Sequence, residues 1–250
     1  MPQPQAPQHP TNHQTTQLLG RSEDELAWFQ RRGLLQAAGV WIAGGGWVSA
    51  HAQGRSNIVE LRGDVLRNGQ KLTPDQRVEA GDSIQTGPGS TAVFAVGNSA
   101  FMVRQNSRLS IDGDAPTAVK ALRLLSGAVA SVWGRGPERQ VVLPTATAGI
   151  RGTGVYVEVF PEQAFRGYLC NCYGTVAVDA GGENVLSQSS YHQSFWAEAE
   201  PRDGKLLRPA GAINHTDDEL EFLAGLINQR TAWQIAGRKG TKDGSGRSGY

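Results

Sequence analysis

The chain is poor in cysteine, methionine and aromatic residues. Its 250 residues include 2 Cys and 2 Met, and aromatic residues make up 7%. Two cysteines exclude a scaffold held together by many disulfides. The formal net charge is +1, so charge gives no sign of a nucleic-acid or strongly acidic partner. With 39% apolar residues, the chain has enough material for one globular domain.

Glycine is abundant, and apolar residues alternate with polar ones. The 32 glycines favour a turn-rich β protein, because glycine supplies the positive φ angles of tight turns. Residues 58–63 and 155–160 alternate with a period of two, as half-buried strands do. Strand-like segments recur about every ten residues, which is typical of a sandwich, barrel or solenoid. We expect an all-β fold, either an antiparallel β-sandwich or a solenoid-like domain.

Local signals predict individual turns and one helix. Two-residue turns are expected at Asn68-Gly69, at residues 97–98 and at Ser126-Gly127, the last between strands at 122–125 and 128–132. Further strands are expected at 91–96, 99–104, 106–111, 140–143, 155–160, 165–172, 175–178 and 190–197. Thr216 and Glu219 form a capping-box pattern before an apolar stripe, which predicts one C-terminal α-helix.

Residues 1–52 read as a targeting region. The first 20 residues have the composition of a disordered segment. Arg31-Arg32, a weakly apolar run and the exit Ala50-His51-Ala52 indicate a twin-arginine-type signal peptide cleaved after Ala52, and hence a periplasmic protein. An uncleaved anchor and an ordinary buried helix are the alternatives. The Gly- and Ser-rich tail at 237–250 is expected to be flexible.

Six segments occur in an order and spacing that resemble the FecR domain family. They are G-D-V-L-R-N-G-Q at 63–70, A-G-D-S-I-Q-T-G at 80–87, G-S-T-A-V-F-A-V-G-N-S at 89–99, N-S-R-L-S-I at 106–111, L-L-S-G-A-V at 124–129 and T-A-T-A-G-I-R-G-T at 145–153. The resemblance covers residues 57–160 and leaves 161–236 as a β extension that carries the helix. It implies a periplasmic, non-catalytic module related to regulators that relay receptor occupancy to a sigma factor.

The chain departs from those regulators upstream of its apolar segment. About 30 residues stand where a sigma-binding helical domain is expected. The chain is thus more similar to stand-alone exported FecR-domain proteins. We expect a non-enzymatic binding or signal-relay module with an envelope protein as partner, bound by surface complementarity or strand addition. A membrane-anchored anti-sigma-type regulator is an alternative. No nucleic-acid partner is expected, and contact with the membrane is expected only through an uncleaved signal segment.

Four residues form a candidate metal-ligand set. Beyond residue 52 the chain has two cysteines, Cys170 and Cys172, and two histidines, His192 and His215. Residues two apart on a strand project from one face, so both thiolates could bind a soft ion such as zinc or copper(I). A Cys170–Cys172 disulfide, with a bulge or turn at Asn171, is the favoured alternative, because exported cysteines usually pair. Unmetallated thiols in the core are a third. No cofactor is otherwise expected.

The segment from Gly149 to Thr153 raises a further hypothesis. Some FecR-type regulators undergo self-cleavage, and a strained Gly152-Thr153 peptide would allow the hydroxyl to attack its own carbonyl. The favoured interpretation is structural: Gly149 and Gly152 permit a tight turn, while Arg151 pairs with a nearby carboxylate or carbonyl. We therefore assign no catalytic residue.

Overall fold

The computed structural model describes residues 56–237, and these fold mostly as β-strands. The strands are β1 Ile58–Arg62, β2 Val65–Arg67, β3 Gln70–Lys71, β4 Ser83–Thr86, β5 Thr91–Val96, β6 Ser99–Val103, β7 Arg108–Ala115, β8 Ala118–Trp133, β9 Arg139–Val142, β10 Thr147–Phe160, β11 Arg166–Ala180, β12 Glu183–Ser189, β13 Gln193–Arg202 and β14 Lys205–Ala210. The helices are η1 Pro161–Gln163, α2 Asp217–Leu226 and α3 Ala232–Ile235. The expected signal segment and most of the expected flexible tail lie outside the described residues. Within the described range, the helices are too short or too polar to cross a membrane.

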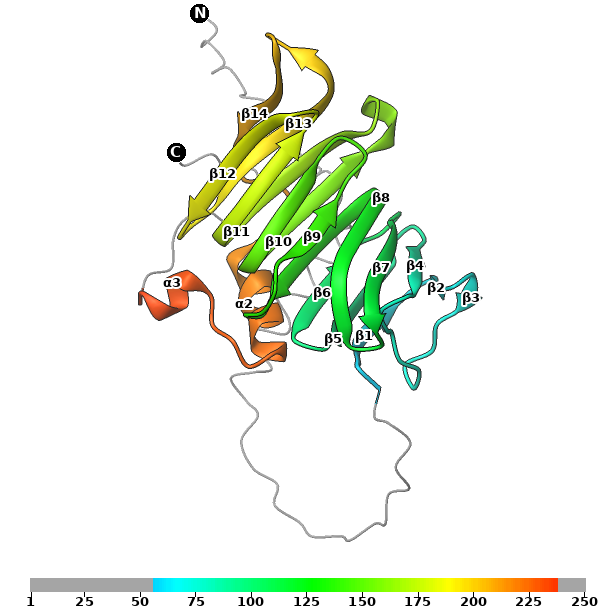
Figure 1. Ribbon diagram of the computed structural model, residues 1–250. Helices are drawn as coiled ribbons and strands as arrows, with labels where there is room; N and C mark the ends of the chain where they lie inside the picture. Colours follow the sequence, from blue (N-terminus) through cyan, green and yellow to red (C-terminus); the bar gives the residue numbers. More distant parts are fainter. Residues whose placement is uncertain (1–55, 238–250) are drawn as a thin grey trace, which may run out of the picture.

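Three long strands, β8, β10 and β11, organise one large sheet (Figure 1). Their pairing partners differ along their length: the C-terminal half of β8 pairs with β6 and β10, while its N-terminal half pairs with β7 and β9. β11 likewise pairs with β13 through its N-terminal half and with β12 through its C-terminal half. The long strands therefore pass from one half of the sheet into the other, as corner strands do in folded-over sheets.

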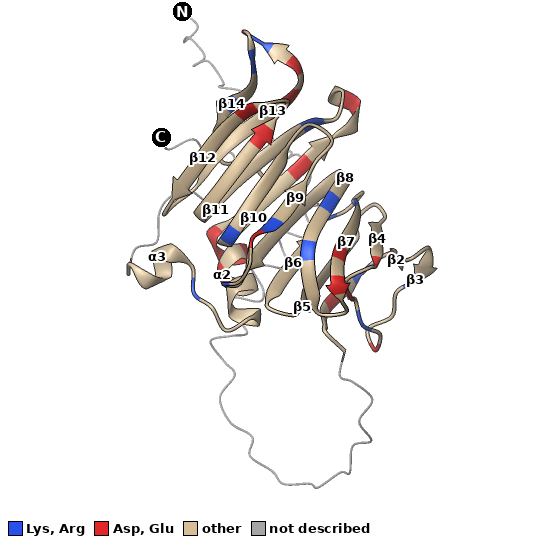
Figure 2. Cartoon of the chain, viewed as in Figure 1, with Lys and Arg blue, Asp and Glu red and all other residues tan. Residues whose placement is uncertain are grey.

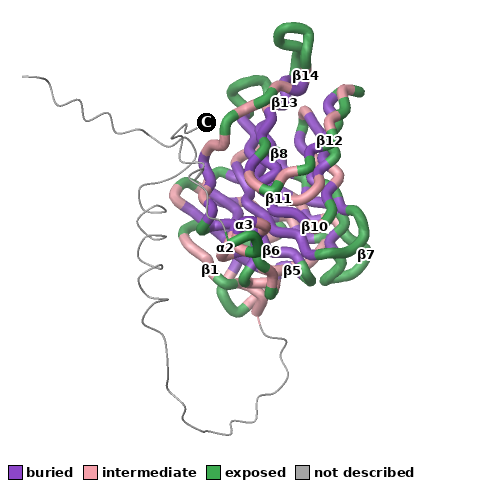
Figure 3. The backbone as a smooth tube through the Cα atoms, turned by 90° about the vertical axis from the view of Figure 1, so that its left-hand side faces the viewer, coloured by how far each residue is buried: buried purple, intermediate pink, exposed green. Residues whose placement is uncertain are grey.

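Two apolar clusters lie on opposite faces of the long strands. The larger cluster contains Phe94, Leu122, Trp133, Val157 and Leu169 among others, and it draws on both halves of the sheet. The smaller cluster takes the alternate side chains of β5, β6, β8, β10 and β11, together with side chains of α2 and α3. Because side chains alternate along a strand, the central strands are buried on both faces where the helices cover them. Residues 128–133 of β8, 153–160 of β10 and 167–173 of β11 are buried without a break, and Figure 3 shows buried backbone through the middle of the sheet.

The expected all-β class with a C-terminal helix is confirmed, and so are several local signals. Asn68 and Gly69 both have positive φ, at 52° and 78°, as a type I′ turn between β2 and β3 requires. β5 and β6 pair about residues 97–98. Thr216 caps α2, and Glu219 completes the capping box. A second short helix, α3, was not expected; Thr231 and Gln234 form its capping box.

The turn predicted at Ser126-Gly127 is wrong. β8 runs without a break from Ala118 to Trp133, and Gly127 lies inside it with φ 76°. The register shift opposite Arg108 and Leu109 of β7 makes Leu125 the additional residue of β8, so a bulge precedes Ser126-Gly127 and the chain does not reverse. Pairing with β6 and β10 on both sides of its C-terminal half keeps the strand extended.

One pairing departs from a purely antiparallel arrangement. β8 and β10 pair directly between residues 127–132 and 154–159, and the earlier parts of both strands diverge. β9 fills the space between them, antiparallel to β10 and parallel to β8. Residues 134–138 connect β8 to β9.

The expected boundary at residue 160 falls between β10 and β11, which pair from Thr147 to Phe160. The division into a FecR-like domain and an extension stays a prediction, and the sheet is continuous across it.

Charged residues of both signs are scattered over the face seen in Figure 2, with no block of one sign. The fold places the smaller apolar cluster between the sheet and the helices α2 and α3.

Candidate metal centre

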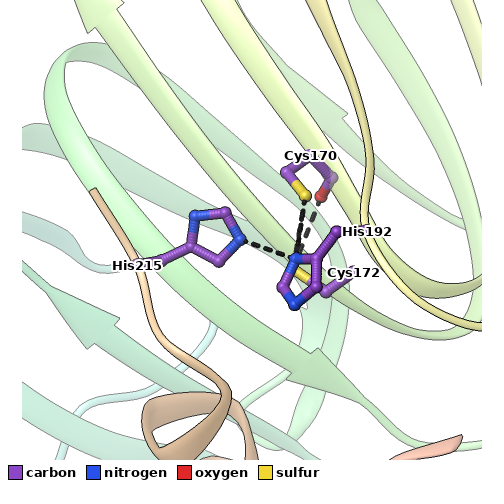
Figure 4. A group of neighbouring side chains, drawn as sticks. All are labelled: Cys170, Cys172, His192 and His215. Carbon is purple, nitrogen blue, oxygen red and sulfur yellow. Dashed lines mark hydrogen bonds between the residues drawn. The ribbon is translucent and has the colours of Figure 1, made fainter. Parts of the chain in front are cut away.

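Four buried side chains converge in the smaller apolar cluster. Cys170 and Cys172 come from β11, His192 from the turn between β12 and β13, and His215 from the connection between β14 and α2. One ligand atom from each lies within 4.8 Å of the others (Figure 4). The structure therefore brings together all four residues of the predicted ligand set, from three separate segments of the chain.

A bulge in β11 places the two sulfur atoms. Asn171 pairs with Val155 and Tyr173 with Gly154, so Cys172 is the additional residue of β11. The Sγ atoms are 3.8 Å apart, and both thiols are free. A disulfide has an S–S distance of about 2.05 Å. The structure thus shows a thiol pair in place of the favoured Cys170–Cys172 disulfide, and the bulge lies one residue beyond the expected Asn171.

Both histidines are held by backbone contacts. The His192 N–H donates to the carbonyl of Cys172 at 2.9 Å, and His192 adopts a left-handed φ of 37°. His215 follows Asn214, whose φ is 55°, and directly precedes the helix cap. Its ring stacks on Tyr156 at 4.6 Å between centroids. Left-handed conformations outside glycine persist where the surroundings impose them, and they concentrate at functional sites.

The second ring nitrogen of each histidine has an oxygen partner. His192 Nε2 lies 2.9 Å from a carboxylate oxygen of Asp217, and His215 Nδ1 lies 2.6 Å from the carbonyl of Ile213. If these nitrogens donate, the tautomers leave His192 Nδ1 and His215 Nε2 as the ligand atoms. Metal-binding histidines almost always have such outer partners, which orient the ring and increase its basicity. Tyr191 donates its hydroxyl to the other oxygen of Asp217 at 2.9 Å.

The separations of the ligand atoms fit one tetrahedral ion. Zn–S bonds of about 2.3 Å and Zn–N bonds of about 2.0–2.1 Å require about 3.8 Å between sulfurs, about 3.5 Å between sulfur and nitrogen and about 3.3 Å between nitrogens. The Sγ atoms are 3.8 Å apart, Cys170 Sγ is 3.4 Å from His192 Nδ1, and the facing nitrogens of the histidines are 3.0 Å apart. These three separations are within about 0.3 Å of the required values, and the other ligand atoms lie within 4.8 Å of one another, so shifts on the order of 1 Å would complete a Cys₂His₂ shell.

The electrostatics of the site separate the two thiols. Burial alone would raise the pKa of Cys170, but the hydrogen bond from Cys172 and the interactions with His215 and His192 hold this pKa well below its ordinary value. Burial and the neighbouring Cys170 raise the pKa of Cys172 well above its ordinary value. Burial acts to lower the pKa of His192, whereas Asp217 and Cys170 raise it to about 9. Without an ion, the site thus favours a thiolate at Cys170 beside a protonated His192, and an ion bound at His192 Nδ1 would take the place of that proton.

Aromatic rings enclose the centre. Trp233 of α3 stacks on the ring of His192 with centroids 5.5 Å apart, and it meets Tyr173 and Tyr191 edge to face at 5.4 and 5.5 Å. Sequence reasoning did not identify Asp217, Tyr156 or Trp233 as parts of the site. The sequence marks Asp217 only as an acidic residue in a helix's first turn, which is the ordinary place for such a residue.

The Gly149–Thr153 segment lies in β10, where Gly149 to Arg151 pair with Thr175 to Ala177 of β11. Arg151 donates to the carboxylate of Glu138 at 2.8 and 3.1 Å, which confirms the expected pairing. The Thr153 hydroxyl is buried and has no hydrogen-bond partner within the described residues, and Gly152 has φ 58°. Self-cleavage at this peptide bond stays a prediction. A side chain at Gly154 would overlap the ring of Tyr173, so this glycine allows Tyr173 to pack toward Trp233.

Comparison with known proteins identifies the first part of the fold. The model of the FecR protein family matches residues 82–164, which end before the four candidate ligands. No curated protein matches the chain significantly. Two crystal structures of a "putative anti-sigma factor" from Parabacteroides distasonis share 11% identity with the chain, each with a TM-score of 0.41. They cover 51% and 58% of this chain, which in turn covers 57% and 73% of theirs. The family model thus assigns residues 82–164 of the chain to a FecR domain.

Proposed function

We propose that this FecR-domain protein binds one zinc ion through Cys170, Cys172, His192 and His215, and that it is a non-enzymatic component of the bacterial envelope. The observation that carries the proposal is the convergence of the four buried ligand atoms within 4.8 Å. Two thiolates and two imidazoles are ligands that zinc accepts in tetrahedral structural sites. Copper(I) prefers similar soft ligands, so it is the competing ion.

The coordination shell favours a structural or regulatory ion over a catalytic one. Catalytic zinc sites use three protein ligands and keep the fourth position for water or substrate. Here four protein side chains can fill a tetrahedral shell, and all four are buried. Asp217 and the Ile213 carbonyl already engage the remaining ring nitrogens. A substrate would therefore have to displace a protein ligand.

Metal analysis of the full chain tests zinc binding. The protein is purified under reducing conditions, and its zinc and copper contents are measured by mass spectrometry. We expect about one equivalent of zinc, and loss of stoichiometric zinc in Cys172→Ser. Tyr173→Phe is the matched control, because Tyr173 is buried next to Cys172 but supplies no ligand. Cobalt substitution should give thiolate-to-cobalt charge-transfer absorption in the wild type and in Tyr173→Phe.

Two results would contradict zinc binding. Wild-type protein that holds neither ion and gives no cobalt spectrum would refute the site. Equal zinc content in wild type and Cys172→Ser would place the ion elsewhere. Copper in preference to zinc, with the same dependence on Cys172, would correct the identity of the ion and keep the ligand set.

A second candidate function, signal relay to an envelope protein, is favoured by an edge strand. Within the described residues β12 pairs with β11 alone, and its Leu186 is 65% exposed. A strand edge beside an exposed apolar residue can accept an extended peptide from a partner. We therefore propose β12 as the contact of the FecR-type relay function, with the partner supplying a strand.

Cross-linking in cells that express tagged full-length variants tests the relay proposal. A protein cross-linked to wild type should be lost in Leu186→Asp and kept in Leu125→Asp, since Leu125 is a 53% exposed residue on β8. If both variants keep every cross-linked protein, β12 is not the contact.

N-terminal sequencing of the exported protein would check the proposed periplasmic location, which requires a chain beginning at Gln53.

A further inference from the structure

The C-terminal segment from Ile213 to Ala236, called the cover here, lies over the smaller apolar cluster. Leu220, Leu223 and Ala224 of α2 are buried in that cluster, together with Trp233 of α3. α2 packs against β6 and β8, strands of the matched FecR domain. The cover therefore encloses an apolar face of the FecR domain itself.

The candidate metal centre joins the cover to the sheet. His215 belongs to the cover, whereas Cys170 and Cys172 belong to β11 and His192 to the turn after β12. Asp217, the first residue of α2, bonds His192 across the same boundary. A single bound ion would thus link three sheet-side ligands to the residue that directly precedes the cap of α2.

Outside the centre, the cover is held by its buried apolar side chains, by one buried ion pair and by hydrogen bonds such as that from Asn214 to Glu158. α2 has ten residues, a length at which an isolated helix is marginal in water. Its buried ion pair, Arg104–Glu219 at 2.8 Å, must offset the desolvation of two charges before it stabilises the docked state. The cover also contains Asn214 with φ 55°, a conformation that needs support from its surroundings. The hydrogen bond from Asn214 to Glu158 gives part of this support, and ligation of the adjacent His215 would add to it.

We infer that zinc bound at Cys170, Cys172, His192 and His215 fastens the cover onto the FecR domain, so that loss of zinc releases the cover and leaves the sheet folded. This inference rests on the proposed zinc binding. Release would expose alternate side chains of β6 and β8, including Ala100, Met102, Ala130 and Val132. The larger apolar cluster lies on the other face of these strands and does not depend on the cover.

Hydrogen exchange measured by mass spectrometry on the full chain tests the inference. Zinc-free protein, prepared with a chelator under reducing conditions, is compared with the same protein given one equivalent of zinc. Peptides from residues 213–236 should exchange more than about tenfold faster without zinc, because local opening sets their protection. Peptides from β5 and β7, which carry side chains of the larger cluster, should keep their protection.

Two variants sharpen the test. His215→Asn removes the ligand supplied by the cover, so its residues 213–236 should exchange at the rapid zinc-free rate whether or not zinc is added. Asp218→Asn changes an exposed residue in the first turn of α2 and should respond to zinc as the wild type does. Restored protection of the cover in His215→Asn on zinc addition would overturn the inference.

The remaining outcomes separate the inference from the proposed function. If metal analysis finds zinc bound and the cover exchanges equally with and without it, the inference fails and zinc binding stands. If chelation removes protection from β5 and β7 as well, the ion holds the whole fold, and the inference fails for that reason. If no zinc binds, both fail together.

Discussion

At the scale of single residues, Asp217 has two tasks that a sequence pattern cannot separate. Its carboxylate lies in the first turn of α2, where negative charge stabilises a helix. The same carboxylate accepts from Tyr191 and lies 2.9 Å from Nε2 of His192. The helix start and the orientation of a candidate ligand therefore depend on one side chain.

We expect Asp217→Asn to weaken zinc binding by about 10- to 100-fold, the range seen when outer partners of metal ligands are removed. The amide loses the negative charge that orients and polarises the His192 ring. Competition with a chromogenic chelator would measure the affinity. Asp218→Asn, exposed one residue further on, is the control and should bind as the wild type does. Equal affinities for both variants would refute the role of Asp217.

Glu158 predicts a pH effect of definite sign. Burial, opposed by hydrogen bonds from Asn214 and Tyr156, raises the pKa of this carboxyl above its ordinary value. The folded state then binds more protons than the unfolded state between the two pKa values, so the contribution of Glu158 to stability falls as pH rises through that window. Glu158→Gln does not titrate, so the stability of the variant relative to wild type should increase from acid to neutral pH.

Urea denaturation at several pH values, on zinc-saturated protein, measures this difference. Gln can still accept from Tyr156 and Asn214 through its amide oxygen. Glu162→Gln, an exposed change nearby on η1, is the control. A stability difference between Glu158→Gln and wild type that stays constant with pH, or shrinks toward neutral pH, would contradict the prediction.

The residues of the candidate centre were partly predictable. A Cys-x-Cys pair on a strand projects from one face, so the sequence is enough to place two sulfurs together. It does not reveal that His192 and His215 meet them, because those contacts depend on how β12, β13 and β14 return along β11. The Cys170–Cys172 disulfide is favoured at the level of sequence because a periplasmic location is expected. The location of a protein does not determine its backbone geometry, and here a bulge at Cys172 accompanies a separation of 3.8 Å between the sulfurs.

At the scale of elements, β8 shows how tertiary pairing overrides a local turn signal. Ser126-Gly127 has the composition of a two-residue turn, yet β6, β7 and β10 all pair with β8 around it. Three neighbouring strands fix its backbone more strongly than local propensity does. The short loops at residues 68–69 and 97–98 join adjacent strands of the sheet, so local signals sufficed there.

Gly127→Ala should destabilise the fold by more than about 2 kcal/mol, because it adds a steric overlap to the cost of a left-handed alanine. A Cβ at Gly127 would lie 2.6 Å from Cα of Ser107 and 2.8 Å from the carbonyl of Asn106. Gly204→Ala is the matched control: its φ is also positive, at 74°, but its Cβ would meet open space. Urea denaturation should give Gly127→Ala a much lower free energy of unfolding than Gly204→Ala. Equal losses of stability in the two variants would rule out an effect of the overlap.

The docking of α2 depends on a buried ion pair. Arg104 and Glu219 are both almost fully buried, and the other Glu219 oxygen accepts from the Thr216 N–H at 2.7 Å. Glu219→Gln should cost about 3–5 kcal/mol, because the buried Arg104 guanidinium loses the carboxylate that it contacts at 2.8 Å. The double change Arg104→Met with Glu219→Gln should recover part of this loss. Chemical denaturation of the two variants would show it, and a double variant no more stable than Glu219→Gln would argue against the pair.

At the scale of the whole molecule, one continuous sheet joins the FecR domain to residues 161–210. β10 pairs with β11 along its length, and Val157 and Leu169 share the larger apolar cluster across residue 160. The sequence resemblance to the FecR family covers residues 57–160, so it ends where β10 ends, and the sheet continues beyond it. The strand order could not be predicted, since β12 and β13 both pair with β11 through contacts that no local pattern specifies.

This continuity predicts that the zinc-saturated chain unfolds as one unit. Pulsed hydrogen exchange at increasing urea concentration should give the same midpoint for peptides from β5 and β6 as for peptides from β11 and β13. Each tenfold rise in free zinc above saturation should raise both midpoints together, since a ligand that binds only the folded state adds about 1.4 kcal/mol per decade. Loss of protection in β11 and β13 at lower urea, with β5 and β6 still protected, would show that residues 161–237 fold as a separate unit.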